Sequence, residues 1–198
     1  MTEADKLELE IMEKAQQLAV LRSSEANAEV QNYQFETLEG RVGLENLFAG
    51  RERLLMIHNM GQGCRYCTLW ADGINGIIDH LEDAMAVAMV SKDAPASQRR
   101  MAMNRGWKFR TASHGGGLYM EEQCTMGEHS NYPGAAAYQM RDGKIYKTGR
   151  TSFGPGDLYS PMWHFLALTG IQSTDWTPQF RYWQLPEKLD DGGENLRD

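Results

Sequence analysis

The sequence predicts an α/β fold, in which a central mixed sheet is flanked by helices and a helical extension precedes the first strand. Apolar runs of strand length, residues 53–58 and 84–91, are each followed by a segment whose apolar residues recur every three or four positions. This alternation is typical of parallel strands joined by helices, whereas Asp142-Gly143 between two later strand-like runs indicates an antiparallel hairpin. A chain of 198 residues is long enough for one such domain and too short for two.

An amphipathic helix is predicted first, over residues 4–21, because Leu7, Ile11 and Leu18 share one face. Its apolar stripe needs a partner, either the body of the same chain or a second subunit, so a homodimer is one expectation. A polar stretch then leads into the body. The chain is expected to divide into an N-terminal helix and linker (1–32), the α/β domain (33–170), and a C-terminal extension with an acidic tail (171–198).

Residues 33–44 alternate between apolar and polar around a glycine, as a strand and turn do, and residues 44–50 suggest one short helical turn. The run 53–58 reads as a central strand. A single apolar helix face is predicted from Trp70 to Leu81, so a helix begins at or near the second cysteine of "GCRYC".

Residues 84–91 form a continuous apolar run, as expected for a parallel strand covered on both faces, and residues 95–105 read as a helix that Gly106 ends. Residues 113–132 are rich in glycine and weakly patterned, which indicates a functional loop or an unrecognised element.

The predicted hairpin centres on Asp142-Gly143, and Ser160-Pro161 then opens a last helix. The aromatic segment 175–183 is expected to pack back on the body, and residues 187–198 to form a loose acidic tail.

The formal net charge of -7 disfavours nucleic acid and anionic membranes as partners, and no apolar run is long enough to span a bilayer. The N-terminus is charged from its third residue and lacks the features of a signal peptide, so the protein is expected in the cytoplasm. Three cysteines are too few for a disulfide framework. In a reducing compartment, a C-x-x-C pair instead indicates redox or metal chemistry.

The order of elements, with "GCRYC" after the central strand and "YPGAAAYQMRDGKIYKTGR" as the closing hairpin, resembles the thioredoxin-like fold in its larger, peroxiredoxin-like (AhpC/TSA-like) form. The similarity spans residues 33–168. The motifs "GCRYCTLWADGING", "GWKF" and "FGPGD" are more narrowly similar to a bacterial thioredoxin-like group catalogued as domain of unknown function 899.

The cysteine pair suggests a thiol-disulfide oxidoreductase. If Cys64 lies just before the helix, unpaired backbone N–H groups and the helix dipole favour its thiolate, and Arg65 adds a cation. Cys67, one turn into the helix, would then be the resolving thiol. The substrate would be a disulfide-containing protein or a small-molecule thiol, with no cofactor or metal required.

Two further site residues come from the thioredoxin resemblance. A proline before the closing strand is usually cis in that fold and holds the substrate near the cysteines; Pro133 matches it. Thioredoxins commonly carry a buried acid six residues before the first cysteine, where this chain has His58, and a tryptophan where it has Gly63. A neutral His58 imidazole could accept the proton of the resolving thiol.

Three alternatives remain open. The chain could be a non-catalytic protein on the same fold, or a metal-binding protein in which Cys64, Cys67, Cys124 and His129 form a zinc-type set. A peroxiredoxin-like peroxidase is the third. The resemblance implies Thr three and Pro seven residues before its reactive cysteine, but Gly61 and Ile57 occupy those positions before Cys64.

Overall fold

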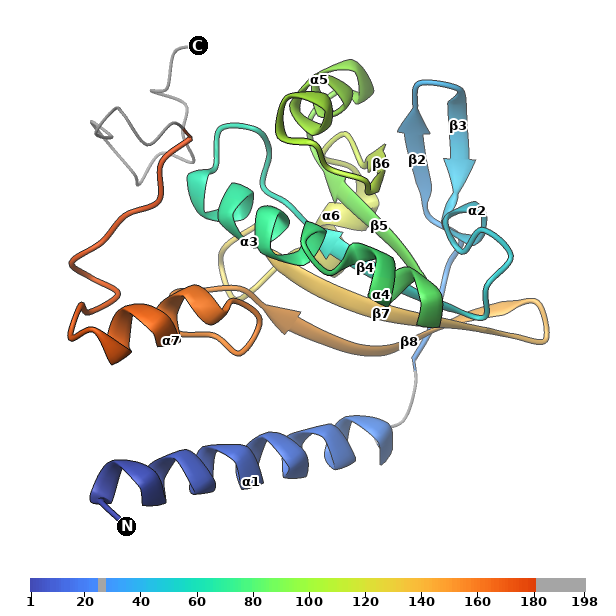
Figure 1. The fold of residues 1–198 in the computed structure, drawn as a ribbon. Helices are drawn as coiled ribbons and strands as arrows, with labels where there is room; N and C mark the ends of the chain where they lie inside the picture. Colours follow the sequence, from blue (N-terminus) through green and yellow to red (C-terminus); the bar gives the residue numbers. More distant parts are fainter. Residues whose placement is uncertain (25–27, 181–198) are drawn as a thin grey trace.

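The computed structural model describes residues 1–24 and 28–180 of the chain. Its elements, in chain order, are α1 (Glu3–Ser24), β1 (Ala28–Val30), β2 (Gln34–Thr37), β3 (Gly40–Gly43), α2 (Leu44–Leu47), β4 (Arg53–His58), α3 (Arg65–Asn75), α4 (Ile78–Ala84), β5 (Ala86–Ser91), α5 (Pro95–Arg105), β6 (Arg110–Ser113), α6 (Leu118–Gln123), β7 (Gly134–Arg141), β8 (Lys144–Ser152) and α7 (Pro161–Leu168). The predicted α/β fold is confirmed (Figure 1).

The strands form one mixed sheet in the order β1-β8-β7-β4-β5-β6-β2-β3. The neighbours β4, β5 and β6 are parallel, and β7 runs antiparallel to β4 on its other side. Every residue of β5 is buried, which explains its continuous apolar run: both faces of a central parallel strand are covered by other elements. β4 therefore lies in the interior of the sheet, between β7 and β5, and the loop after it leaves from its C-terminal end.

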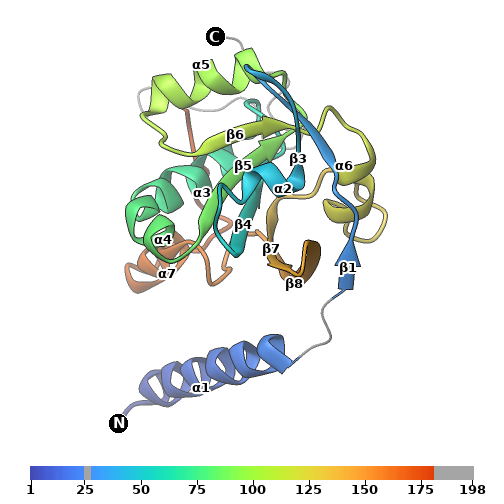
Figure 2. The ribbon, with the colours of Figure 1, turned by 90° about the vertical axis from the view of Figure 1, so that its right-hand side faces the viewer.

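Each face of the sheet has its own hydrophobic cluster. One cluster contains Leu44 and Leu47 of α2 and Tyr119 of α6. The other contains Trp70 of α3 and Trp163 of α7. The two ribbon views show the same division, with α3, α4 and α7 on one side of the central strands and α2 and α6 on the other (Figures 1 and 2). Met56 of β4 belongs to the first cluster. Because side chains alternate along a strand, every second residue of β4 points to that same face of the sheet.

Helix α1 lies outside the layers around the sheet, below β8 and α7 in both ribbon views (Figures 1 and 2), and it contacts β8. The next described element, β1, pairs antiparallel with β8 at the edge of the sheet, and sequence patterning did not predict this strand. Within residues 1–24 and 28–180, no helix is both long enough and apolar enough to cross a membrane.

The hairpin prediction is confirmed: β7 and β8 pair, and Asp142 and Gly143 both have positive φ, 50° and 76°. The prediction of one helix face from Trp70 to Leu81 is wrong, because the helix ends at Asn75 and a new one begins at Ile78. The break leaves Ile77 exposed, although it shares the apolar spacing.

The weakly patterned stretch 113–132 contains an element that sequence reasoning did not identify, helix α6. In the aromatic segment that was expected to pack on the body, the ring of Trp176 lies edge-on against Trp163, with centroids 6.0 Å apart. The rest of that segment and the predicted acidic tail lie outside the described residues.

Candidate functional site

The cysteine pair lies where the loop after β4 enters helix α3. Cys64 is the N-cap residue of the helix, with extended backbone angles (φ -93°, ψ 106°). The loop turns at Gly61, whose φ of 125° favours glycine, and an added Cβ there would lie 2.9 Å from an Asp93 carboxylate oxygen. That carboxylate accepts the Gln62 backbone N–H at 2.6 Å. The loop is thus held against the residues that follow β5, and it delivers Cys64 to the start of the helix.

The sulfur of Cys64 accepts a hydrogen bond from the backbone N–H of Cys67 at 3.2 Å, as an N-cap side chain does. The Cys67 thiol is the main cause that lowers the pKa of Cys64, by donating a hydrogen bond to its sulfur. Burial opposes this effect, and the backbone N–H groups of Cys67 and Tyr66 reinforce it. Hydrogen bonds from the first helical turn therefore favour the Cys64 thiolate.

Cys67 is in the opposite situation. It is 3 % exposed, and burial raises its pKa well above the ordinary value, with further increases from the hydrogen bond with Cys64 and from the charge of Cys64. Its sulfur accepts the backbone N–H of Met60 at 3.4 Å. The pair therefore consists of one thiol whose thiolate is stabilised and one that keeps its proton. Neither cysteine forms a disulfide here.

Arg65 follows Cys64 and is 5 % exposed. Its guanidinium lies 5.9 Å from the centre of the Phe180 ring, so a cation–π contact joins the start of α3 to the C-terminal segment. The Phe180 carbonyl in turn accepts a hydrogen bond from Arg105 at 3.4 Å. The C-terminal segment is thereby held against the helix that carries the cysteines.

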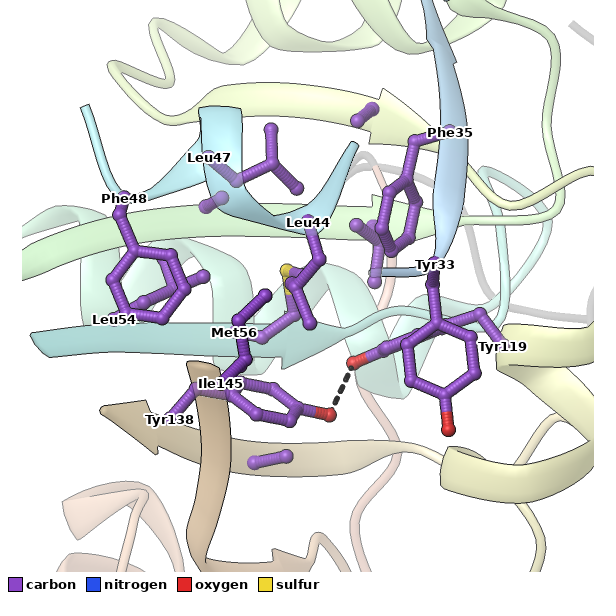
Figure 3. Close-up of a cluster of buried hydrophobic side chains, with 14 of the residues drawn as sticks. Tyr33, Phe35, Leu44, Leu47, Phe48, Leu54, Met56, Tyr119, Tyr138 and Ile145 are labelled. Atoms are coloured by element: carbon purple, nitrogen blue, oxygen red, sulfur yellow. Dashed lines mark hydrogen bonds between the residues drawn. The ribbon is translucent and has the colours of Figure 1, made fainter. Parts of the chain in front are cut away.

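His58, the last residue of β4, is buried at 5 % exposure. Its Nε2 lies 2.7 Å from the hydroxyl of Tyr119. The Tyr119 hydroxyl is in turn 3.1 Å from the hydroxyl of Tyr138, the bond drawn in Figure 3. Burial is the main cause that lowers the pKa of His58 to about 3, and electrostatic interactions with His114 and Lys147 act in the same direction. The imidazole is therefore neutral at physiological pH.

The alternation along β4 turns His58 toward the tyrosine side of the sheet, and its hydrogen bond is made to Tyr119. Tyr119 was missed by sequence reasoning. It comes from α6, and the helix formers in "LYMEEQ" immediately after Gly117 are the signal that could have revealed this helix.

Pro133 directly precedes β7, whose first residue, Gly134, pairs with His58. Asn131, with φ of 55°, donates its side-chain amide to the Met60 carbonyl at 3.1 Å. The Pro133 loop therefore lies beside the loop that leads to the cysteines.

The expectation of a cis bond at Pro133 is wrong, since no peptide bond among residues 1–24 and 28–180 is cis. The chain turns instead at Asn131, and the Tyr132 N–H donates to the carbonyl of Cys124 at 2.6 Å.

The zinc-type set weighed from sequence is not assembled: the described residues contain no group of three or more His, Cys, Asp or Glu side chains that could hold a metal ion. Cys124 is instead part of the hydrophobic cluster with Tyr119 and Tyr138, at 3 % exposure. Burial raises its pKa to about 12. A buried, protonated thiol among aromatic rings is a packing residue.

Comparison with known families matches residues 4–185 to the family described as bacterial protein of unknown function (DUF899). No curated protein matches the chain.

Solved structures share the fold at low identity. AhpC of Enterococcus faecalis matches with a TM-score of 0.52 and 11% identity, over 74% of this chain and 96% of that chain. The bacterioferritin comigratory protein of Xanthomonas campestris, studied for alkyl peroxide reduction, matches with a TM-score of 0.51 and 11% identity, over 69% and 90%. Reduced Prx3 of Vibrio vulnificus in complex with hydrogen peroxide matches with a TM-score of 0.50 and 13% identity, over 73% of this chain and 99% of that chain. The thioredoxin-like fold inferred from the motifs is confirmed.

Proposed function

The chain belongs to the bacterial family DUF899 and has a thioredoxin-like fold, and we propose that it is a thiol-disulfide oxidoreductase whose reactive pair is Cys64 and Cys67. One observation carries the proposal: the sulfur of Cys64 caps helix α3 and accepts the Cys67 N–H at 3.2 Å, whereas Cys67 is buried one turn later. This placement lowers the pKa of Cys64 and raises that of Cys67. This asymmetry is what an attacking thiol and a resolving thiol require.

In the proposed reaction, the Cys64 thiolate attacks one sulfur of a substrate disulfide. The substrate S–S bond breaks, its other sulfur leaves as a thiolate that takes up a proton, and Cys64 forms a mixed disulfide. Cys67 then loses its proton and attacks the Cys64 sulfur. The mixed disulfide breaks, the second substrate thiolate leaves, and a Cys64–Cys67 disulfide forms. The substrate gains two electrons and the protein loses two; the reverse sequence oxidises a dithiol.

Formation of the mixed disulfide removes two of the causes that raise the pKa of Cys67, namely the negative charge of Cys64 and the hydrogen bond with Cys64, and leaves burial as the third. The buried resolving thiol therefore becomes easier to deprotonate at the moment when its thiolate is needed. A proton acceptor must still be supplied by solvent, by the departing thiolate or by a protein group, and His58 in that role remains a prediction.

Two other neighbours of the pair have proposed roles. Pro133 and its loop would hold the substrate chain beside the Met60 segment, a role supported by the contact between Asn131 and Met60. Arg65 would steady the start of the helix through Phe180. We propose the cytoplasm as the compartment, where a reducing thiol pool can regenerate the pair.

The proposal is tested by alkylating the reduced protein with iodoacetamide across pH and identifying the labelled cysteine by mass spectrometry. Cys64 is expected to react first, with the midpoint of its rate profile below that of a free thiol. Reduction of a disulfide substrate, such as insulin with dithiothreitol as electron donor, is expected to be lost in Cys64→Ser. The control is Cys124→Ser, which removes a cysteine outside the pair.

Failure would be clear from either measurement. A Cys64 that titrates like a free thiol removes the basis for the mechanism, and a Cys64→Ser protein with full reductase activity shows that turnover does not use this sulfur. In a Cys67→Ser protein the mixed disulfide is expected to accumulate, because the resolving thiol is gone.

A peroxidase is the second candidate, favoured by the fold shared with one protein described for its alkyl peroxide reduction activity and with another solved in complex with hydrogen peroxide. The Cys64 thiolate would attack a peroxide O–O bond, releasing an alcohol or water and leaving a sulfenic acid. Cys67 would then form the disulfide and release water. Peroxide consumption with a thiol reductant, lost in Cys64→Ser, would favour this reaction, while peroxide inertness alongside insulin reduction would favour disulfide exchange.

A further inference from the structure

Helix α1 carries an apolar face that the described chain leaves largely uncovered. Leu7, Ile11 and Leu18 lie along one side of the helix and are 52 %, 56 % and 36 % exposed. They border a groove of about 310 Å³, which Leu158, 54 % exposed, closes on the side of the body. The groove has room for several aliphatic side chains, whereas a well-packed contact between a helix and the body of a protein leaves few voids larger than a water molecule.

The spacing of the residues on this face is that of a helix which pairs with another helix. Residues 4, 7, 11, 14, 18 and 21 follow the alternating steps of three and four that define the contact seam of a coiled coil. Five of these positions are apolar: Ala4, Leu7, Ile11, Leu18 and Leu21. Lys14 is the polar exception near the middle, the kind of residue that selects one register by penalising others.

The charges of α1 indicate which helix would fit and in which direction. Residues 3–13 hold five acidic side chains and one lysine, a net charge of -4, whereas residues 14–22 hold Lys14 and Arg22 and no acid, a net charge of +2. A parallel copy would place the two acidic halves side by side. An antiparallel copy would place each acidic half beside a basic half.

We propose that α1 is a dimerisation arm: the α1 helices of two copies of this chain pair antiparallel, and each inserts apolar side chains into the groove between the other helix and its Leu158. A two-fold axis near the middle of the helices makes the contact self-complementary, with Leu7 of one copy opposite Leu18 of the other. Arg22, whose guanidinium donates to the Tyr159 hydroxyl at 2.8 Å, anchors the end of the arm on its own body. The groove is then filled from the partner.

The first test is the mass of the full-length protein in solution by light scattering after size exclusion. A dimer of about twice the 22.4 kDa of one chain is expected. Ile11→Glu is expected to give a monomer, because it places a charge in the groove. Leu9→Glu is the matched control: Leu9 is also exposed, at 55 %, but lies about 200° around the helix from Ile11, so the dimer is expected to persist.

The second test establishes direction. In a Cys64→Ser background, which prevents exchange through the reactive pair, Leu7→Cys protein mixed with Leu18→Cys protein is expected to form an intermolecular disulfide under mild oxidation. Leu7→Cys alone is not, because eleven residues separate the two positions by about 16 Å along antiparallel helices.

Three results would overturn the proposal. A monomeric parent protein at micromolar concentration shows that no copy fills the groove. A dimer that survives Ile11→Glu has its interface elsewhere. Efficient cross-linking of Leu7→Cys to itself requires a parallel pair. Circular dichroism of each variant must retain the parent helix content, so that loss of the dimer is not loss of the fold.

Discussion

Lowering the pH is expected to destabilise this fold through its buried histidines before the carboxylates contribute. Burial holds the pKa of His58 at about 3, whereas the unfolded chain binds that proton near 6.5. His114 behaves similarly, with a pKa that burial and Lys92 lower to about 4. Below pH 6.5 the unfolded state therefore takes up protons that the folded state excludes, and stability falls as the pH falls.

The size of the effect follows from the linkage. Each histidine contributes a slope of about 1.4 kcal/mol per pH unit in the window between its unfolded and folded pKa values. From pH 6.5 to pH 5 this amounts to about 2 kcal/mol for His58, and up to about the same again for His114. The loss is a large share of the 5–15 kcal/mol stability range of natural domains.

The measurement is urea denaturation of the reduced protein at several pH values between 7.5 and 5. In His58→Gln, which keeps a hydrogen-bonding group but does not titrate, the slope below pH 6.5 is expected to fall by about half. His80→Gln, on the exposed face of α4, is the control and is expected to keep the parent slope. A parent free energy of unfolding that stays constant from pH 7 to pH 5 would refute the reasoning.

Three further predictions concern packing. Gly134→Ala is expected to cost about 1–3 kcal/mol in urea denaturation, because the added Cβ would lie 3.1 Å from the carbonyl carbon of Thr151 and closer still to its oxygen. Gly149→Ala on the same hairpin is the control: a Cβ there meets nothing within 4 Å, so stability should change by less than about 1 kcal/mol. Equal losses in the two variants would contradict this account. Met56→Ala, at a fully buried position, is expected to cost about 2–5 kcal/mol by the same measurement. Cys124 is expected to resist alkylation at pH 8 until urea unfolds the protein, and labelling in the native state would show that its burial is incomplete.

The central strands, the β7–β8 hairpin and the cysteine helix could be predicted from sequence because local rules decide them, whereas the edge strand β1 could not. The continuous apolar run of β5 requires cover on both faces, and Asp142-Gly143 fits the positive φ angles of a tight hairpin. The helix break before Ile78 could not be predicted, because the apolar spacing continues through Ile77 although the helix itself ends at Asn75.

The partners of the candidate site were harder to predict, since they depend on tertiary contacts. Nothing local to β4 indicates that His58 meets Tyr119, which lies 61 residues later in the chain. The expectation of a cis bond at Pro133 came from the resemblance and not from the residues of this chain, and the structure has a trans bond there, two residues after the left-handed backbone of Asn131.

The sulfur of Cys64 is both the proposed nucleophile and the N-cap acceptor of helix α3. Helix starts are usually closed by an oxygen of Ser, Thr, Asp or Asn, but here a sulfur receives the Cys67 N–H. Any covalent adduct on that sulfur weakens the acceptor, and the opening turn of α3 then loses its closure. Amide hydrogen exchange at Cys67 would consequently report the chemical history of Cys64, giving a backbone readout of turnover that needs no knowledge of the physiological substrate.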